Sequence, residues 1–540
     1  MSSVELGLGD RDVITPLWIG ADKRGFKEVS TERKDLFLRS PQTVVDLETL
    51  ALVEVDRLHE SVDHTQTAIG SLTLFESLVS PSTDIDLIQS KQKAVRELIQ
   101  DEELRNSVLN YLNEYHEHEG DLFNLLNRHI EPLSPYGPFK KGVKEGRKIH
   151  DLSRQLQLPQ SDYLRSLIQS LHQFGDTSVY QLMRGPIYRG LRKLKPREQV
   201  RFPRSLVHFE PRRLSKGVLA AMSPMLLEMT NITNVTDAGP GKVSSSFLML
   251  YMMSYIGPSM YAMIMKVGID YASVIQKIAQ VALKDSDFLE ALHTVGKLDE
   301  LMSFVQTSMV NPNMTVLPDI TDNPTHSFPA DGLRNPVLVN STYIVPNDID
   351  LSSDRLTFLT GPNSGGKTTI CKSIVESQIL AQIGSPIFAN RASINIADRI
   401  AYQAPRFDSL GDPDGRFGTE LKRTASIFYT STPKSLVVLD ELAEGTTLEE
   451  KMEHSKSVLL GFEELGSSTV LVTHNHALVD EFKEENRGQF LQVEFNGEGP
   501  TYRIIHGISR VSHANKIVEK LGFSERERQR YIKRVKGHQQ

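Results

Sequence analysis

The chain has 540 residues, of which 39% are hydrophobic and 24% are charged, an ordinary composition for a folded protein of about three or four domains. Its net charge of −7 argues against a protein coated by nucleic acid over its whole surface, but it leaves room for a local basic surface. The single cysteine, Cys371, cannot form an internal disulfide. Together with an N-terminus that lacks the basic and then apolar pattern of a signal peptide, this predicts a reducing, cytoplasmic location.

The first part of the chain has the residue spacing of helices. Residues 1–40 are polar and show no clear period, but from Val44 to about Asn127 apolar residues recur three and four positions apart. The sequence Pro81-Ser82-Thr83-Asp84 predicts a helix break followed by a new N-cap. Residues 149–182 and 269–310 show the helical spacing again. We therefore expect an irregular segment at 1–40 and a helical domain at 41–310.

Residues 183–216 are strongly basic, and only Glu198 and Glu210 oppose the positive charge. Such a run is often a solvated face. Here, however, Tyr188, Phe202 and Phe209 are interleaved with the basic residues, which suits a surface that contacts a phosphate backbone. Both interpretations stay open. The candidate contacts to a nucleic-acid backbone are Arg184, Arg189, Arg192, Lys193, Lys195 and Arg197.

A second unusual segment, Phe247–Met265, has 19 residues without a charge, a length that permits a membrane span. Gly257 and Pro258 interrupt its middle, and it is rich in methionine, which suits irregular packing between helices. The segment is therefore either a buried helix or helix pair broken near Pro258, or a membrane-associated helix.

The character of the chain changes in its C-terminal part. Residues 311–336 are rich in proline, asparagine, aspartate and threonine, which is typical of a linker. From Val337 predicted strands alternate with helices, so we expect an α/β domain at 337–510. Residues 511–540 form a basic tail of helical composition. The predicted fold class is α+β multidomain, with an all-α domain before an α/β domain.

The sequence at 361–368, GPNSGGKT, fits the phosphate-binding loop pattern G-x-x-x-x-G-K-[ST]. It follows a predicted strand at Leu356–Leu359 and precedes a predicted helix at Ile370–Leu380, as the motif requires. Glycines let backbone N–H groups turn toward phosphates, and the helix N-terminus adds partial positive charge. Lys367 is expected to reach the phosphates, and the Thr368 hydroxyl to bind Mg²⁺. ATP and Mg²⁺ are the predicted cofactors of a P-loop ATPase domain.

Two further motifs follow in the order that such a site requires. Leu436–Leu439, after Ser435, is an apolar run typical of a buried parallel strand, and it ends in Asp440 and Glu441. Asp440 is expected to hold Mg²⁺ through water, and Glu441 to polarise the attacking water. A third strand, Thr469–Val472, leads to His474, which could contact the γ-phosphate.

These motifs resemble those of the MutS family of ATPases, within the wider ABC-type class. The family's loop GPN-x-GGK-[ST]-T corresponds to GPNSGGKTT at 361–369, and its second motif corresponds to LVVLDELAEGT at 436–446. The segments NPVL at 335–338, VPND at 345–348 and SHANKIVEKLG at 512–522 resemble the family's flanking sequences. The resemblance covers roughly residues 40–525. It implies a helical core whose lever helices reach a DNA clamp.

Two departures from the family pattern change what we expect. The helical core begins near residue 40, so the N-terminal mismatch-reading domain is expected to be absent, and so is a C-terminal Smr nuclease domain. The family's signature turn, which reaches the partner's γ-phosphate, is matched only loosely by GRFGTE at 415–420. Hydrolysis is therefore expected to be slow or differently regulated.

The resemblance also implies a role for each matching residue. Two such ATPase domains face each other, so a dimer, expected to be a homodimer, is implied, with Arg416 and Thr419 acting in trans. Glu441 and His474 are the implied catalytic residues, and Thr368 and Asp440 the implied Mg²⁺ ligands. The implied nucleotide-binding residues are Tyr343, Asn347, Gly361, Pro362, Asn363, Ser364, Gly365, Gly366, Lys367, Thr368 and Thr369.

Three hypotheses about function follow. The first is an ATP-dependent clamp that opens or closes around branched or mismatched DNA, in repair or recombination, together with downstream repair factors. The clamp would contact the backbone of double-stranded DNA without reading its sequence. The second is an ATP-driven factor that acts on RNA or ribosomes. The third is a membrane-tethered ATPase that uses Phe247–Met265.

Overall fold

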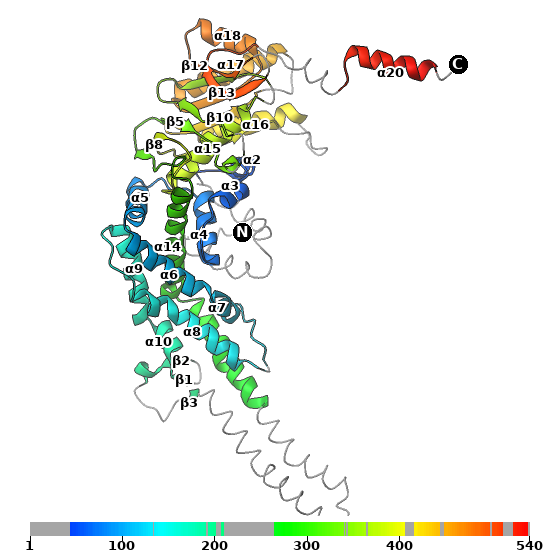
Figure 1. Ribbon diagram of the computed structural model, residues 1–540. Coiled ribbons are helices and arrows are strands. Elements are labelled where there is room, and N and C mark those ends of the chain that lie inside the picture. The colour runs from blue at the N-terminus through cyan, green and yellow to red at the C-terminus, as the bar shows by residue number, and fades with distance from the viewer. Residues whose placement is uncertain are drawn as a thin grey trace, which may run out of the picture. The chain divides into compact units, whose positions relative to one another are not determined.

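The computed structural model describes residues 44–132, 134–190, 193–200, 207–209, 264–339, 341, 344–362, 365–405, 415–442, 448–496, 499–510 and 522–537. They form two compact units (Figure 1). The first combines Thr65–Thr73 with Asp101–Glu300, and the second combines residues 44–64 with Leu74–Gln100 and Leu301–Gln540. Residues 1–40, and 247–263 of the uncharged segment, lie outside the described residues. Within the described part of the chain, no helix is both long enough and apolar enough to cross a membrane.

The first unit is mainly helical, which confirms the expectation from the residue spacing. Its core includes Leu125, Phe139, Ile187 and Val274, all almost fully buried. A small antiparallel sheet in the order β2-β1-β3 packs on this core through Phe209, whose ring meets that of Phe139 edge-on at 5.7 Å. The elements are α6 (Glu102–His116), α7 (Glu119–Leu126), α8 (Tyr136–Ser153), α9 (Asp162–Gln173), α10 (Ser178–Arg184), β1 (Ile187–Arg189), β2 (Leu194–Pro196), β3 (Val207–Phe209), the π-helical turn η4 (Tyr271–Ile275) and α13 (Gln276–Ala282).

Two buried carboxylates hold the start of α4 (Ala68–Val79) in this unit. Asp299, on the long helix α14 (Ser286–Val310), accepts hydrogen bonds from the backbone N–H groups of Gln66, at 3.0 Å, and Thr67, at 2.7 Å. Glu119 accepts a further bond from the N–H of Ala68 at 3.0 Å. Carboxylates satisfy the unpaired donors at a helix N-terminus and complement its dipole. Burial nevertheless raises the pKa of Asp299 to about 6, because desolvation outweighs these hydrogen bonds.

The second unit contains a six-stranded sheet in the order β13-β12-β7-β11-β10-β9. Its strands pair in parallel, except that β12 and β13 form an antiparallel hairpin. Strands β7 and β11 are buried along their whole length, as in a sheet covered on both faces. The strands are β7 (Leu356–Thr360), β9 (Ile400–Gln403), β10 (Leu436–Asp440), β11 (Ser468–Val472), β12 (Gln489–Phe495) and β13 (Pro500–His506).

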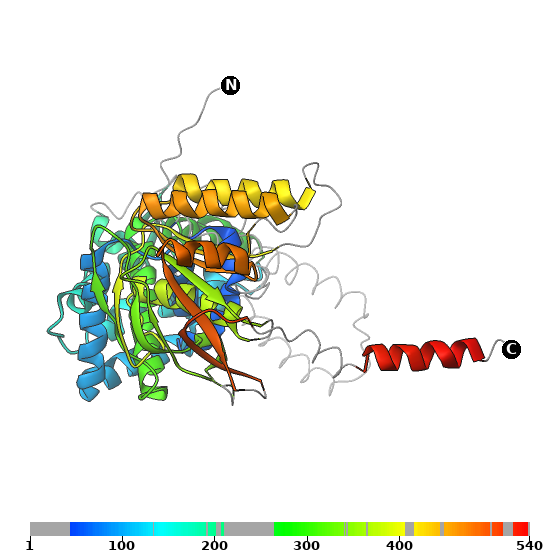
Figure 2. The same ribbon diagram turned by 90° about the horizontal axis from the view of Figure 1, so that it is seen from above.

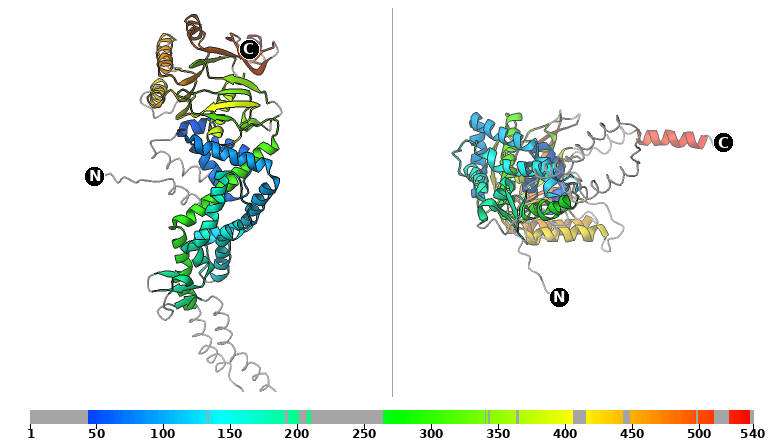
Figure 3. Two further views of the ribbon diagram at one scale, coloured as in Figure 1. Left: turned by 90° about the vertical axis from the view of Figure 1, so that its left-hand side faces the viewer. Right: turned by 90° about the horizontal axis from the view of Figure 1, so that it is seen from below.

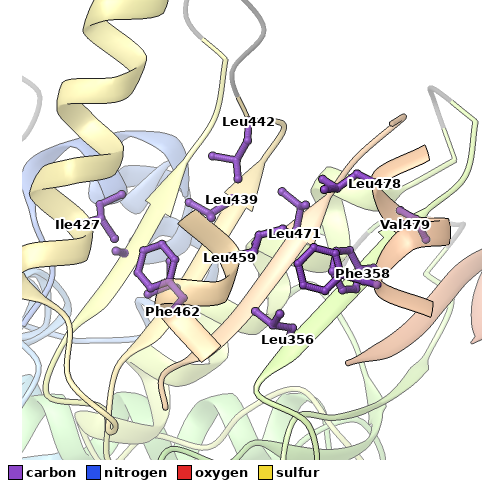
Figure 4. Packing of buried hydrophobic residues seen from close by; sticks show 13 residues of the cluster. Leu356, Phe358, Ile427, Leu439, Leu442, Leu459, Phe462, Leu471, Leu478 and Val479 are labelled. Carbon is purple, nitrogen blue, oxygen red and sulfur yellow. The ribbon is translucent and has the colours of Figure 1, made fainter. Parts of the chain in front are cut away.

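Helices α16, α17 and α18 share a core with this sheet. Phe358 of β7 and Leu439 of β10 pack with Phe462 of α17 and Ile427 of α16 (Figure 4). Helices α16 and α17 lie alongside each other (Figures 2 and 3), where the ring centroids of Phe428 and Phe462 are 5.1 Å apart. The α-helices that lie wholly in this unit are α2 (Leu47–Leu52), α3 (Val55–Val62), α5 (Ile85–Gln100), α15 (Lys367–Gln382), α16 (Gly415–Thr430), α17 (Leu448–Leu465), α18 (His476–Glu484) and α20 (Glu525–Gly537), and the ends of α4 and α14 also belong to it.

The predicted helix break at Pro81–Asp84 is confirmed. Helix α4 ends at Val79 and α5 begins at Ile85, and the Asp84 carboxylate accepts hydrogen bonds from the N–H groups of Asp86 and Leu87 at 3.0 and 3.1 Å.

The interpretation of residues 311–336 as an irregular linker is wrong. This range contains β4 (Asp319–Thr321) and β5 (Pro329–Leu333), which join β6 (Asn347–Asp350) and β8 (Arg391–Asn395) in a sheet of order β4-β8-β5-β6. The strands form because Ile320, Ala330 and Leu333 are buried against the rest of the unit. Pro329 is tolerated because it is the first residue of its strand.

Candidate nucleotide site

The predicted motifs meet at one edge of the six-stranded sheet. The glycine-rich loop follows β7, Asp440 is the last residue of β10, and Thr473 and His474 follow β11. Because these three strands are parallel neighbours, their carboxyl ends lie side by side. Ligands of open α/β sheets bind at this edge.

Lys367 is the first residue of α15 and is 6% exposed. Its ammonium group donates hydrogen bonds to the carbonyl oxygens of Gly361, at 2.9 Å, and Pro362, at 3.0 Å. It also lies 3.3 Å from Nε2 of His474. Burial lowers the pKa of Lys367, although Asp440 and Glu441 act in the opposite direction. The lysine therefore ties the loop after β7 to the histidine after β11.

Two glycines of the loop adopt backbone angles that other residues avoid. Gly361 has φ 147°, and a Cβ there would lie 3.0 Å from side-chain atoms of Val493 on β12. Gly366, with φ 89°, is the N-cap of α15. The motif's glycines are thus required for the close approach of backbone to β12 and for the turn into the helix.

Thr368 and Asp440 form the part of the site suited to a metal ion. The Thr368 hydroxyl donates a hydrogen bond of 3.0 Å to Oδ2 of Asp440. Both groups offer the hard oxygen ligands that Mg²⁺ prefers. Since Mg²⁺ at a nucleotide site also keeps waters and binds phosphate oxygens, one hydroxyl and one carboxylate are a sufficient protein contribution.

Glu441 has a left-handed backbone conformation, with φ 66°, which is uncommon for a residue other than glycine. Its N–H donates to the Val472 carbonyl at 2.9 Å, so the turn is anchored to β11. One carboxylate oxygen accepts a hydrogen bond from the N–H of His474 at 3.2 Å, and the other lies 3.6 Å from Nζ of Lys451. Strained conformations of this kind are concentrated at functional sites. The Glu441 carboxylate thus contacts His474, which itself lies beside Lys367.

These side chains line a pocket with a volume of about 810 Å³, which suits a nucleotide-sized ligand. Its lining combines the polar residues described above with apolar ones, among them Leu338, Ile344 and Val345. Predicted residues that line the pocket are Asn347, Gly365, Gly366, Lys367, Thr368, Thr369, Asp440, Glu441 and His474.

Tyr502 also lines the pocket, and the sequence patterns did not predict it. It lies on β13, is 47% exposed, and has φ 62°. Its carbonyl accepts a hydrogen bond from the side chain of Asn347 at 3.1 Å, and Asn347 also accepts one from the N–H of Ile504 at 2.7 Å. Asn347 therefore holds β13 against β6. No local signal marks Tyr502, because a lone tyrosine in a strand is usual.

The remaining predicted residues either lie outside the described part of the chain or do not line the pocket. Tyr343, Asn363 and Ser364 lie outside the described residues. Arg416 and Thr419 belong to the first turns of α16, and the side chain of Arg416 is not described. Among the described residues that line the pocket, none comes from α16.

The basic candidates lie on and around β1 and β2 of the first unit. Arg189 pairs with the buried Asp270 at 2.9 Å and is only 19% exposed, so it makes an internal contact. Arg184 is exposed and lies 3.8 Å from Glu198. Lys193, Lys195 and Arg197 are exposed, and Arg192 lies outside the described residues.

The chain therefore belongs to the class of proteins that combine a helical unit with an α/β unit. The α/β unit carries a glycine-rich loop, an acidic pair and a histidine at the carboxyl ends of parallel strands. Two family models match the chain, MutS domain III over residues 42–305 and MutS domain V over residues 357–523. The chain belongs to the MutS family.

Several curated relatives are DNA mismatch repair proteins. The chain is 34% identical to MutS of Desulforamulus reducens over 220 residues, which cover 40% of this chain and 25% of the relative. It is 25% identical to MutS of Prochlorococcus marinus over 529 residues, covering 86% of this chain and 56% of the relative. It is 29% identical to msh3 of Aspergillus oryzae over 252 residues, covering 44% and 22% respectively. These matches span between 22% and 56% of each relative's length.

Proposed function

We propose that the protein binds ATP with Mg²⁺ at this site and hydrolyses it, and that the nucleotide state opens or closes the helical unit around branched or mismatched DNA. The observation that carries the proposal is the meeting of Lys367, Asp440 and Glu441 in one pocket of nucleotide size. The names of the curated relatives, DNA mismatch repair proteins, support DNA as the substrate rather than RNA, ribosomes or a membrane.

Each pocket residue has a role that its position suits. Lys367 and the loop N–H groups bind the phosphates, and Thr368 and Asp440 hold Mg²⁺, which neutralises charge on the phosphate oxygens. Glu441 orients and polarises the attacking water, while His474, next to Lys367, contacts the γ-phosphate. The strained turn at Glu441 keeps its carboxylate in place before ATP binds.

The active form is proposed to be a homodimer. Helix α16, which carries Arg416 and Thr419, contributes no described residue to the pocket of its own chain. We propose that its first turns instead complete the site of a second copy. In such an arrangement, ATP binding would change the distance between the two ATP-binding units of the dimer. Downstream repair factors would detect this change in the shape of the dimer.

DNA is proposed to contact the protein by its backbone. Lys193, Lys195 and Arg197 are exposed and basic, and they suit phosphate contacts that do not depend on sequence. Binding should then weaken steeply as salt is raised.

The decisive experiment measures ATP hydrolysis by the purified protein alone and with homoduplex, mismatched and four-way-junction DNA, at low and moderate salt. We expect one of these DNA forms to change the rate severalfold. A rate indifferent to every DNA, together with no DNA binding at low salt, would refute the clamp proposal.

Replacing Tyr502 with alanine should weaken ATP binding by about tenfold, because an exposed aromatic ring that lines the pocket is suited to stack on the base. Equilibrium binding of a fluorescent ATP analogue measures the change. Tyr531→Ala, on α20, removes an exposed ring outside the pocket and should leave binding unchanged. Equal affinities of the Tyr502 variant and the wild type would show that the base binds elsewhere.

A further inference from the structure

The segment that begins the described chain adds to the edge of the six-stranded sheet. Val45 pairs with Ile400 of β9 in parallel, and the Val44 carbonyl accepts a hydrogen bond of 2.8 Å from the Ile400 N–H. Among the described strands, β9 is otherwise at the edge of the sheet, where it pairs with β10. The start of α2 is thereby fixed beside the strand that leads toward α16.

Asp46, the next residue, connects this segment to α16. Its two carboxylate oxygens accept paired hydrogen bonds from the guanidinium group of Arg423, at 2.8 and 2.9 Å. Arg399 donates a further bond at 2.9 Å. The Asp46 and Arg423 side chains are only 18% and 14% exposed. Paired Arg–carboxylate bonds in a largely buried setting are stronger and more directional than a surface ion pair.

Arg423 lies one helical turn beyond Thr419 on α16. Its Nε also lies 3.2 Å from Glu48 of α2, and the neighbouring Thr424 hydrogen-bonds with Gln403, the last residue of β9. Rotation or sliding of α16 would have to break this set of bonds. Together with the packing of Ile427 and Phe428 on the core, the set holds the first turns of α16 in one direction.

The same segment also reaches the helix that follows the phosphate loop. Glu54, between α2 and α3, forms an ion pair with Lys372 of α15. Lys372 lies little more than one turn after Lys367. Residues 44–62 thus touch both the helix that starts at the pocket and the helix that carries the trans residues.

We propose that Asp46 is a positioning residue for ATP hydrolysis: through Arg423 it orients the first turns of α16 so that they complete the site of the partner copy. This inference rests on the proposed function. It predicts that loss of the Asp46 charge slows turnover without weakening ATP binding, because α16 contributes no described residue to its own chain's pocket.

Asp46 has a second role, because it caps α2 by accepting a hydrogen bond of 2.9 Å from the Thr49 N–H. The substitution Asp46→Asn separates the two roles. Asparagine caps a helix as well as aspartate does, so the variant keeps α2 and removes the charge paired with Arg423. Asp101→Asn is the matched control, since Asp101 caps α6 through a bond of 2.9 Å from the Leu104 N–H.

For the full-length protein we expect kcat of Asp46→Asn to fall about tenfold while its affinity for ATP stays within about twofold of wild type. Hydrogen exchange of the amides in α16 should become faster. Arg423→Gln should reproduce both effects, and the double variant should be no slower than the single ones, because the two residues act as a unit. Asp101→Asn should match wild type in all three measurements.

Unchanged exchange in α16 would show that Asp46 does not hold the helix. Faster exchange with normal kcat would show that the orientation of α16 does not matter for turnover. Either result would overturn the inference. A wild-type protein that fails to hydrolyse ATP in the same series would instead refute the proposed function, so the two failures are distinguishable.

Discussion

Glu441→Gln should slow ATP hydrolysis by about a hundredfold or more while ATP binding persists. Glutamine has nearly the same shape, and it can still accept the hydrogen bond that the N–H of His474 donates to this side chain at 3.2 Å. It lacks the negative charge that polarises the attacking water. Since Lys367, Thr368 and Asp440 are unchanged, the phosphates and Mg²⁺ should bind as before.

The rate is measured by phosphate release, and binding by equilibrium titration with ATP and Mg²⁺. Glu449→Gln provides the matched control, because Glu449 is an exposed residue in the first turn of α17. The clamp proposal adds a second expectation, which is that the Glu441 variant stays in its ATP-bound state on DNA. Turnover at the wild-type rate would mean that another group activates the water.

Lys367→Ala should weaken ATP binding by about a hundredfold, the second large effect that we expect. The ammonium group is the pocket's buried positive charge at the start of α15, and charge-assisted bonds to phosphate are about twice as strong as neutral ones. Its present acceptors, the carbonyls of Gly361 and Pro362, lie at the loop where phosphates are expected. Loss of the lysine therefore removes both the charge and two contacts that shape the loop.

Binding is measured with ATP at several Mg²⁺ concentrations, and thermal unfolding checks that the variant is folded. Lys483→Ala, an exposed lysine on α18, removes one charge from the same unit and should bind ATP normally. If Lys367→Ala binds ATP as tightly as wild type, the glycine-rich loop is not the phosphate site.

Much of the fold was predictable because its signals are local. The continuous apolar runs Leu356–Leu359 and Leu436–Leu439 predicted buried strands, and the spacing of the glycines before Lys367 predicted a tight loop between a strand and a helix. The same local approach failed at residues 311–336. There β4 and β5 are short, and their pairing partner β8 begins at Arg391, well beyond any sequence window.

The sequence by itself determined which chemical groups follow each strand: a lysine and a threonine after β7, two carboxylates at the end of β10, and a histidine after β11. Only the tertiary structure decided which distant residues support them. Tyr502 reaches the pocket because β13 pairs beside β12 and β6 holds its backbone through Asn347. Asp46 meets Arg423 although 377 positions separate them, because the first described segment joins the edge of a sheet formed much later in the chain. Contacts of this kind leave no trace in local spacing, since they depend on strand order rather than on neighbouring residues.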